Sequence, residues 1–148
     1  MEMNKKRIIS GLLVVLLISL GIIYAYYQYN RTNKSLAGIK PDFVVAAESV
    51  IKEFSDHETD ANKKYLGKIL SVTGMVKRVE KDEKGFYTLL VGDSDSPSSV
   101  RCSIDSLYSN AVVAYLRGMQ IRIKGNCTGF NADELLGSDL ILNHCVIE

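Results

Sequence analysis

Apolar and polar residues alternate along residues 68–80, KILSVTGMVKRVE, where Val72 and Val76 are apolar and Gly74 lies between them. Alternation with a period of two is typical of a strand with one buried face, so we expect a long strand here. Glycine inside a strand permits the sharp bend of a barrel corner, and the shift in phase from Val76 to Val79 indicates a β-bulge. The stretch predicts the first strand of a small closed barrel.

Four shorter segments further along the chain have strand patterns as well. The clearest is the third strand, where Val100, Cys102 and Ile104 alternate with polar residues and define one inner face. A helix-like segment, residues 105–116, separates the third strand from the fourth and ends before Gly118. The five predicted strands are residues 68–80, 86–92, 99–104, 119–124 and 140–147.

The segment before the barrel has the spacing of an amphipathic helix. Pro41 suits the first turn of a helix, because the N–H that proline lacks has no intrahelical partner there. The apolar stripe that follows consists of Phe43, Ala47, Val50 and Phe54. We expect this helix to pack on its own barrel, with a dimerising helix as the alternative. A second short helical stretch ends at Gly67.

The predicted order is strand, strand, strand, helix, strand, strand, which is the layout of the OB-fold. The fold class is therefore mainly β: a five-stranded OB-fold barrel with an N-terminal amphipathic helix, a helix between strands 3 and 4, and an N-terminal transmembrane helix. A half-open sheet in another α+β arrangement is the alternative, because five strands alone do not determine a topology.

Residues 8–27 carry no charge and, at ~1.5 Å per residue, are long enough as a helix to cross the ~30 Å hydrocarbon core of a bilayer. Lys5, Lys6 and Arg7 precede this segment, and tyrosines cluster at its far end. We expect a single-pass anchor with a cytoplasmic N-terminus and an extracytoplasmic C-terminal domain; a cleaved secretory signal is the alternative. The predicted parts are a basic N-terminus (1–7), the anchor (8–27), a linker (28–40), a helical lead-in (41–67) and the barrel (68–148).

Four stretches of the chain carry a family resemblance: DANKKYLGKILSVTGMVKRV, VRCSI, GMQIRIKGNCTGF and LILNHCVI. Together they resemble the tRNA_anti-like family of OB-fold proteins, many of whose members look like small exported or membrane-attached bacterial proteins. The resemblance covers roughly residues 46–148. It implies an OB barrel, but it brings no agreed activity, ligand or catalytic residue, and the family's name is not evidence of tRNA binding.

The charge is unevenly distributed along the chain. Residues 1–27 hold three basic residues and one acidic residue, a net charge of +2, whereas the remainder holds 15 basic and 16 acidic residues, a net charge of −1. A domain without basic excess lacks the electrostatic footprint for gripping a phosphate backbone. The balance therefore disfavours nonspecific nucleic-acid binding.

Whether the three cysteines form disulfides depends on the redox state of the compartment. Cys127 closes the fourth strand and Cys145 lies in the fifth, so a hairpin centred near Leu136 places them opposite each other. A disulfide is then possible if the Cβ atoms lie within ~4.5 Å. We expect this disulfide in an extracytoplasmic domain, with free core thiols as the alternative. Cys102 shares the inner face of its strand and is interpreted as a buried apolar residue.

Metal, cofactor and catalytic motifs are absent from the sequence. No ligand pair has a spacing such as C-x2-C, and Asp93 and Asp95 are interpreted as a solvated turn rather than a calcium loop. The chain has no G-x-S-x-G and no glycine-rich phosphate loop, and its two histidines leave little room for acid–base work. We expect no metal site, no cofactor and no catalytic residue, in a protein that is not an enzyme.

A binding surface is the remaining possibility. OB-folds usually bind ligands on the face of strands 2 and 3 and on the loops that join strands 1–2 and 4–5. The candidate ligand-binding residues there are Tyr87 and Arg101 on strands, with Lys81, Lys84, Phe130 and Asn131 in loops. The alternative is that Tyr87 is partly buried packing and that the charges are solvated.

The sequence predicts a membrane-anchored, extracytoplasmic binding or assembly module without catalytic activity. The expected partners are the membrane, through residues 8–27, and an envelope protein, a glycan or another envelope component. A nucleic-acid-binding OB domain is the alternative function. A purely structural, self-associating unit is a third hypothesis, and it depends on the helix predicted near residues 43–54.

Overall fold

The structure is a computed structural model that describes residues 2–29, 35–112, 114–115, 117–133 and 135–148. The chain divides into two compact units, Met1–Lys34 and Ser35–Glu148. The helices are α1 (Glu2–Tyr29), α2 (Ala47–Asp56), α3 (Glu58–Tyr65) and α4 (Ser109–Val112), with short 3-10 helices η1 (Leu36–Gly38) and η2 (Ser106–Tyr108). The strands are β1 (Phe43–Ala46), β2 (Ile69–Lys81), β3 (Tyr87–Gly92), β4 (Ser99–Ile104), β5 (Gln120–Asn131) and β6 (Asp139–Ile147).

The first unit contains one helix, α1, of 28 residues. Its segment Ile9–Tyr27 has a mean hydropathy of 2.3 and is long and apolar enough to cross a membrane. The predicted basic N-terminus, residues 1–7, enters α1 at Glu2, and its side chains lie outside the described part.

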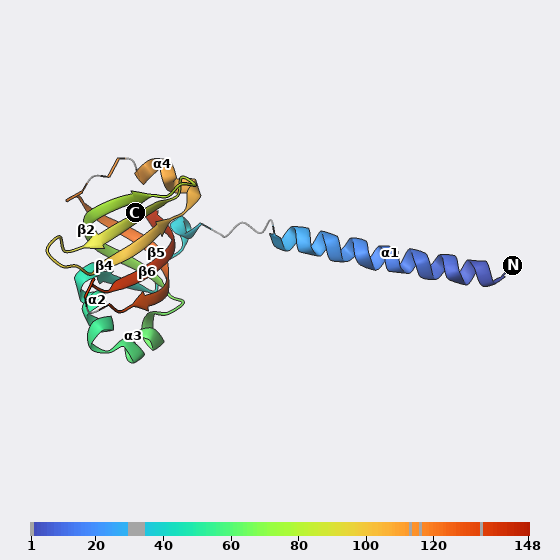
Figure 1. Cartoon of the computed structure of the whole chain (residues 1–148), viewed down its shortest axis with the longest axis horizontal. Coiled ribbons are helices and arrows are strands. Elements are labelled where there is room, and N and C mark those ends of the chain that lie inside the picture. Colours follow the sequence, from blue (N-terminus) through green and yellow to red (C-terminus); the bar gives the residue numbers. More distant parts are fainter. Residues whose placement is uncertain (1, 30–34, 113, 116, 134) are drawn as a thin grey trace. The chain divides into compact units, whose positions relative to one another are not determined.

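The second unit is a closed barrel in which β2 is the longest strand and pairs with three others, β1, β3 and β5. The sheet order is β1-β2-β3-β4-β6-β5, and an additional antiparallel pairing of β2 with β5 closes it. The first half of β2 pairs with β5 and the second half with β3, and the change occurs at Met75. The predicted five-stranded OB-fold is therefore confirmed, with β1 as a sixth strand beside it (Figure 1). The predicted bulge in this strand is confirmed by a register shift between Val76 and Arg78.

Gly74 lies where three elements pack closely. A Cβ at this position would stand 2.7 Å from Val91 Cγ1 and 3.0 Å from the Cβ of Ala47. Both neighbours are buried, at 0% and 1% exposure. The glycine therefore allows β2 to approach β3 and the start of α2, in addition to lying beside the change of strand partner at Met75.

The segment before the barrel begins as a strand, which corrects the predicted helix start. Phe43–Ala46 forms β1 and pairs in parallel with Leu70–Thr73 of β2. Two adjacent β-branched residues, Val44 and Val45, favour this extended backbone, and β2 offers it an unpaired edge. The helix follows as α2, and its stripe Ala47, Val50, Ile51 and Phe54 is buried in the domain's own core.

The expected linker at residues 28–40 is only partly described, because residues 30–34 lie outside the described part. Residues 28 and 29 continue α1, and η1 packs on the barrel with Leu36 buried. The Lys124 ammonium donates to the Ala37 carbonyl oxygen at 3.3 Å. The polypeptide thus joins the barrel at η1, ahead of the predicted helical lead-in.

Two further boundaries differ from the prediction. The helix expected at residues 105–116 is shorter and consists of η2 and α4, with residues 113 and 116 outside the described part. The fourth barrel strand, β5, continues to Asn131, so Phe130 and Asn131 are strand residues rather than loop residues. Phe130 stacks on Phe54 of α2 with ring centroids 4.9 Å apart, and this contact extends the strand toward the helix.

The register of the β5–β6 hairpin also differs from the predicted one. Cys127 pairs with Leu142, because the hairpin is centred at residue 135, where Asn131 pairs with Asp139, and the register shift between Cys127 and Gly129 moves the pairing by one more residue. Cys145 therefore does not stand opposite Cys127, which was the premise of the predicted disulfide. All three cysteines are buried thiols in the structure.

Candidate ligand-binding face of the barrel

The outer surface of β2, β3, β4 and β6 carries a polar layer over the apolar core. In β3, Leu89 and Val91 belong to the core cluster, whereas Thr88 and Leu90 alternate with them and face the other way. Arg101 lies opposite Leu90 in the β3–β4 ladder. The face where OB-folds usually bind their ligands thus presents charged and hydroxyl groups around one covered leucine.

A chain of ion pairs crosses this face and compensates the charge of Arg101. Its guanidinium Nη1 lies 3.2 Å from Glu80 Oε2 on β2, and its Nε lies 3.5 Å from Asp139 Oδ2 on β6. The other oxygen of Glu80 pairs with Arg78 at 3.3 Å, and the Ser99 hydroxyl donates to Asp139 at 2.7 Å. Half-exposed pairs of this kind contribute about 0–1 kcal/mol each, so their main effect is to balance the charge.

A cleft of about 260 Å³ lies at the edge of this face, and we call it the cationic cleft. Among the described residues that line it, three are cations and none is acidic: two of the cations come from β2 and one from the turn before β5. The cationic cleft is lined by Lys77, Arg78, Leu90, Ser94, Pro97, Ser99 and Arg117.

Lys77 is the most enclosed of the three cations. Its ammonium donates to the carbonyl oxygens of Ser96 at 2.5 Å and Ser98 at 2.9 Å, and so links β2 to the loop before β4. Burial lowers the pKa of Lys77, although Asp139 and Asp93 act in the opposite direction. Within the described residues, no carboxylate forms an ion pair with this ammonium, so it is a partly buried cation that neutral carbonyls alone satisfy.

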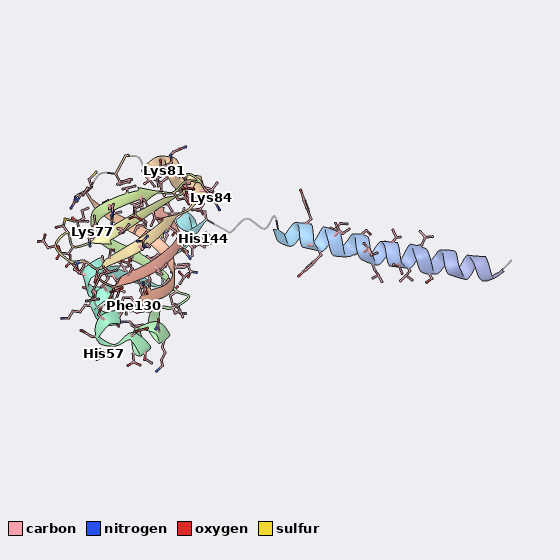
Figure 2. The ribbon with its side chains drawn as sticks, viewed as in Figure 1. His57, Lys77, Lys81, Lys84, Phe130 and His144 are labelled. Atoms are coloured by element: carbon pink, nitrogen blue, oxygen red, sulfur yellow. The ribbon has the colours of Figure 1, made fainter. Side chains whose placement is uncertain are left out.

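The predicted site residues do not form one cluster. Lys81 Nζ stands 5.2 Å from the centre of the Tyr87 ring, and that ring is half-buried against the core. Lys84 lies in the turn between β2 and β3, where the Asp82 carboxylate accepts its backbone N–H at 2.9 Å. Figure 2 shows Lys81 and Lys84 toward one end of the barrel and Phe130 near α2.

Sequence reasoning did not identify the cleft residues as a site. In the sequence, Lys77 and Arg78 are two consecutive cations at the predicted bulge, and a bulge changes the direction in which a strand's side chains point. Ser94 and Pro97 belong to the segment interpreted as a solvated turn, and Asp93 does accept the N–H of Asp95 there at 3.1 Å. Nothing in the sequence placed Arg117 beside them.

Metal binding has little support in the described part of the chain. No group of three or more histidine, cysteine, aspartate or glutamate side chains stands together there in a way that holds a metal ion. The cationic cleft has the opposite character, because ammonium, guanidinium and hydroxyl groups donate hydrogen bonds to anions.

Comparison with known proteins agrees with this fold. The profile of a family described as tRNA_anti-like matches residues 1–143. A Klebsiella pneumoniae protein named "putative nucleic acid-binding lipoprotein" superposes with a TM-score of 0.53 and 16% identity, over 70% of this chain and 90% of that one. An Entamoeba histolytica asparaginyl-tRNA synthetase gives a TM-score of 0.41 and 14% identity, over 55% of this chain and 20% of that one. No curated protein matches the sequence. At 16% identity the Klebsiella pneumoniae structure shows the fold alone.

Proposed function

The chain belongs to the tRNA_anti-like family, and from that membership and the geometry of the barrel we propose a membrane-anchored binding module that takes an anionic group in the cationic cleft. The helix α1 is the anchor, and the barrel lies outside the cytoplasm. The barrel acts by binding and has no catalytic role. A charged glycan, an envelope protein with an acidic segment or another anionic envelope component is the partner class.

The anchoring part of the proposal rests on the apolar segment Ile9–Tyr27 and its flanks. Lys5, Lys6 and Arg7 precede the segment, and cations at one end favour the cytoplasmic side for that end. In intact cells, a protease added outside is expected to degrade the barrel while α1 stays with the membrane pellet after alkaline extraction. A barrel that becomes sensitive only after lysis would reverse the orientation, and a barrel released into the alkaline supernatant would identify α1 as a cleaved signal.

The observation that carries the binding part is the partly buried ammonium of Lys77 beside Arg78 and Arg117. A partly desolvated cation whose hydrogen-bond partners are neutral carbonyls is costly, and an anion that enters the cleft would replace part of the lost solvation. The Ser94 and Ser99 side chains add hydroxyl groups to the same lining. An anion would therefore meet charge and hydrogen-bond donors together.

Nucleic acid is the weaker of the two ligand classes. From Ser35 to Glu148 the chain has 13 lysine and arginine residues against 16 aspartate and glutamate residues, a net charge of −3. Arg101 at the centre of the face is paired with Glu80 and Asp139, and Lys81 lies over the ring of Tyr87. Base stacking needs free aromatic rings among uncompensated cations.

The test is a titration of the full-length chain in zwitterionic micelles with inorganic phosphate, followed by amide NMR. We expect shifts in the loop before β4 and at the turn of Arg117, and we expect R117Q to weaken binding about tenfold, the loss of one charge-assisted hydrogen bond. K63Q is the matched control, because Lys63 is an exposed lysine of α3 that does not line the cleft. Equal effects of R117Q and K63Q would refute the cleft.

A single-stranded oligonucleotide in the same assay tests the alternative function. If the barrel binds the oligonucleotide, the amide NMR signals of Tyr87 and of the turn with Lys81 and Lys84 would shift. The affinity for the oligonucleotide would fall steeply as the salt concentration rises. That result, combined with no phosphate response at Arg117, would replace the anionic-component proposal with nucleic-acid binding.

A further inference from the structure

The interior of the barrel holds two thiols on neighbouring strands. Cys102 and Cys145 are both fully buried in the core, and Cys145 stands opposite Ile104, one inward-facing position along β4 from Cys102. Burial, together with the neighbouring Cys102 thiol, raises the pKa of Cys145. Cys102 also donates to the Val100 carbonyl oxygen at 3.8 Å. Cys127, the third cysteine, pairs with Leu142 across the β5–β6 ladder. Cys102 and Cys145 therefore lie on β4 and β6, two parallel neighbours.

One extra residue in β6 brings Cys145 to this position. Cys102 stands opposite Leu142 and Ile104 stands opposite Cys145, so β6 uses three residues where β4 uses two. Strict alternation from Leu142 would turn residue 144 inward. His144 instead has φ = 54°, a left-handed backbone that costs about 1–2 kcal/mol in an L-residue. The bulge turns Cys145 into the core.

The opposite strand leaves room for the sulfur. A Cβ on Gly125 of β5 would lie 2.5 Å from Cys145 Sγ and 3.0 Å from the Cβ of Leu142. The backbone N–H of Asp105 donates to the Cys145 carbonyl oxygen at 2.9 Å and fixes the strand beyond the bulge. Glycine on β5, the left-handed residue on β6 and the register shift thus act together to place one thiol against the other.

We propose that Cys102 and Cys145 form a disulfide that ties β4 to β6 inside the barrel. The inference rests on the proposed extracytoplasmic location, because disulfides persist in oxidising compartments. The oxidant is the disulfide of a thiol–disulfide exchange partner. One S–S bond forms between the two cysteines and the partner's S–S bond is reduced, so that two electrons and two protons pass to the partner as two thiols.

The bond forms before the barrel closes. Both sulfurs are buried in the folded domain, and burial raises the pKa of Cys145, which disfavours the attacking thiolate there. In the unfolded or partly folded chain both thiols are accessible to the oxidant. The same burial then protects the finished bond from reductants.

The first experiment identifies the bond in cells. The full chain is expressed in a bacterial envelope, its thiols are trapped with an alkylating agent in denaturant without reductant, and the digest is mapped by mass spectrometry. We expect Cys102 linked to Cys145 and Cys127 alkylated. A Cys127–Cys145 link overturns the pairing, and three alkylated cysteines overturn the disulfide.

A second measurement separates this inference from the proposed location. S55C, at an exposed position of α2, is introduced into a chain without its three cysteines and treated with a membrane-impermeant maleimide in intact cells. If the maleimide labels S55C from outside and the first experiment finds three free thiols in the native chain, the disulfide is refuted and the location stands. Labelling only after lysis would refute the location instead.

Refolding in a glutathione redox buffer tests the pairing in either case. The linked Cys102–Cys145 form is expected to exceed the free form roughly tenfold, because the native fold holds the two cysteines on neighbouring strands and favours the bond. C127A is the matched control and should leave the linked fraction unchanged. G125A should lower that fraction, because its new Cβ displaces Cys145 Sγ. A linked fraction no higher than in urea would overturn the proposal.

Discussion

The tight approach at Gly74 makes G74A a direct test of how β2 packs in the barrel. The new methyl group would stand 2.7 Å from Val91 Cγ1 and 3.0 Å from the Cβ of Ala47, closer than unstrained carbon atoms come. Val91 is fully buried near the end of β3, so its side chain has little space to move aside. The backbone of Gly74 is not left-handed, and the substitution therefore tests packing alone.

The expected cost follows from two opposing effects. Overpacking a well-packed core costs about 1–3 kcal/mol, whereas replacing a strand glycine with alanine returns about 0.5–1 kcal/mol of backbone entropy. We therefore expect G74A to lower the free energy of unfolding by about 1–2 kcal/mol. V91A alone should cost about 2–3 kcal/mol through lost burial and the cavity it leaves.

The assay is urea unfolding of the full-length chain in zwitterionic micelles, followed by near-UV circular dichroism of the tyrosines. The double variant G74A/V91A should lose about 1 kcal/mol less unfolding free energy than the two single variants lose together, because V91A removes the atom that the Cβ of G74A would strike. G129A is the matched control, since a Cβ there meets nothing within 4 Å. If G74A costs no more than G129A, or if the two changes are additive, the packing account of Gly74 is wrong.

Three further predictions concern the core, the acid limit and the thiol pair. F54A should lower the unfolding free energy by about 3–5 kcal/mol in the same urea assay, because Phe54 is fully buried where α2 covers the barrel. The hydrogen bond from Ser71 is the main reason that the pKa of Glu148 lies below its ordinary value of 4.5. This stabilisation is present above pH 4.5 and is lost as the pH falls through the lowered pKa. In thermal melts, the melting temperature of E148Q should therefore fall less steeply at acidic pH than that of the native chain. If Cys102 and Cys145 are linked, the oxidised chain should exceed the reduced chain by ~4 kcal/mol in unfolding free energy, since the bond closes a loop of about 40 residues; equal midpoints would contradict the bond.

The strand pattern determined most of the barrel in advance. Five strand-like segments, interrupted by one helical segment, favoured the OB topology, and the phase change after Val76 located a bulge that the structure contains. These features are local in the chain. They survive because one face of each strand must be buried, which ties the sequence pattern directly to the fold.

The errors arose where two local patterns fitted the same residues. Phe43 begins a helical stripe in the sequence, but the unpaired edge of β2 recruits Phe43–Ala46 as a strand. Phe130 follows a glycine and was expected in a loop, but stacking on Phe54 holds it in β5. In both cases a partner distant in the sequence decides the outcome, and propensity alone carries no information about it.

The candidate site was less predictable than the fold for a related reason. The predicted binding residues were selected by their strand and loop positions, whereas the cationic cleft takes its cations from β2 and from the turn that holds Arg117. The charge of Arg101 was visible in the sequence, but its two carboxylate partners come from β2 and β6. Charge compensation across a sheet depends on register, and the sequence does not state the register between distant strands.

One structural device links the cleft and the thiol pair. In both β2 and β6 an extra residue breaks the alternation of faces. In β2 it lies at the register shift between Val76 and Arg78, and in β6 it lies at the left-handed His144. In β2 the extra residue puts Lys77 and Arg78, two consecutive cations, at the same cleft. In β6 it turns Cys145 toward Cys102. A slip of one residue exchanges the two faces of a strand. The cationic cleft and the pair of thiols therefore both depend on these two extra residues.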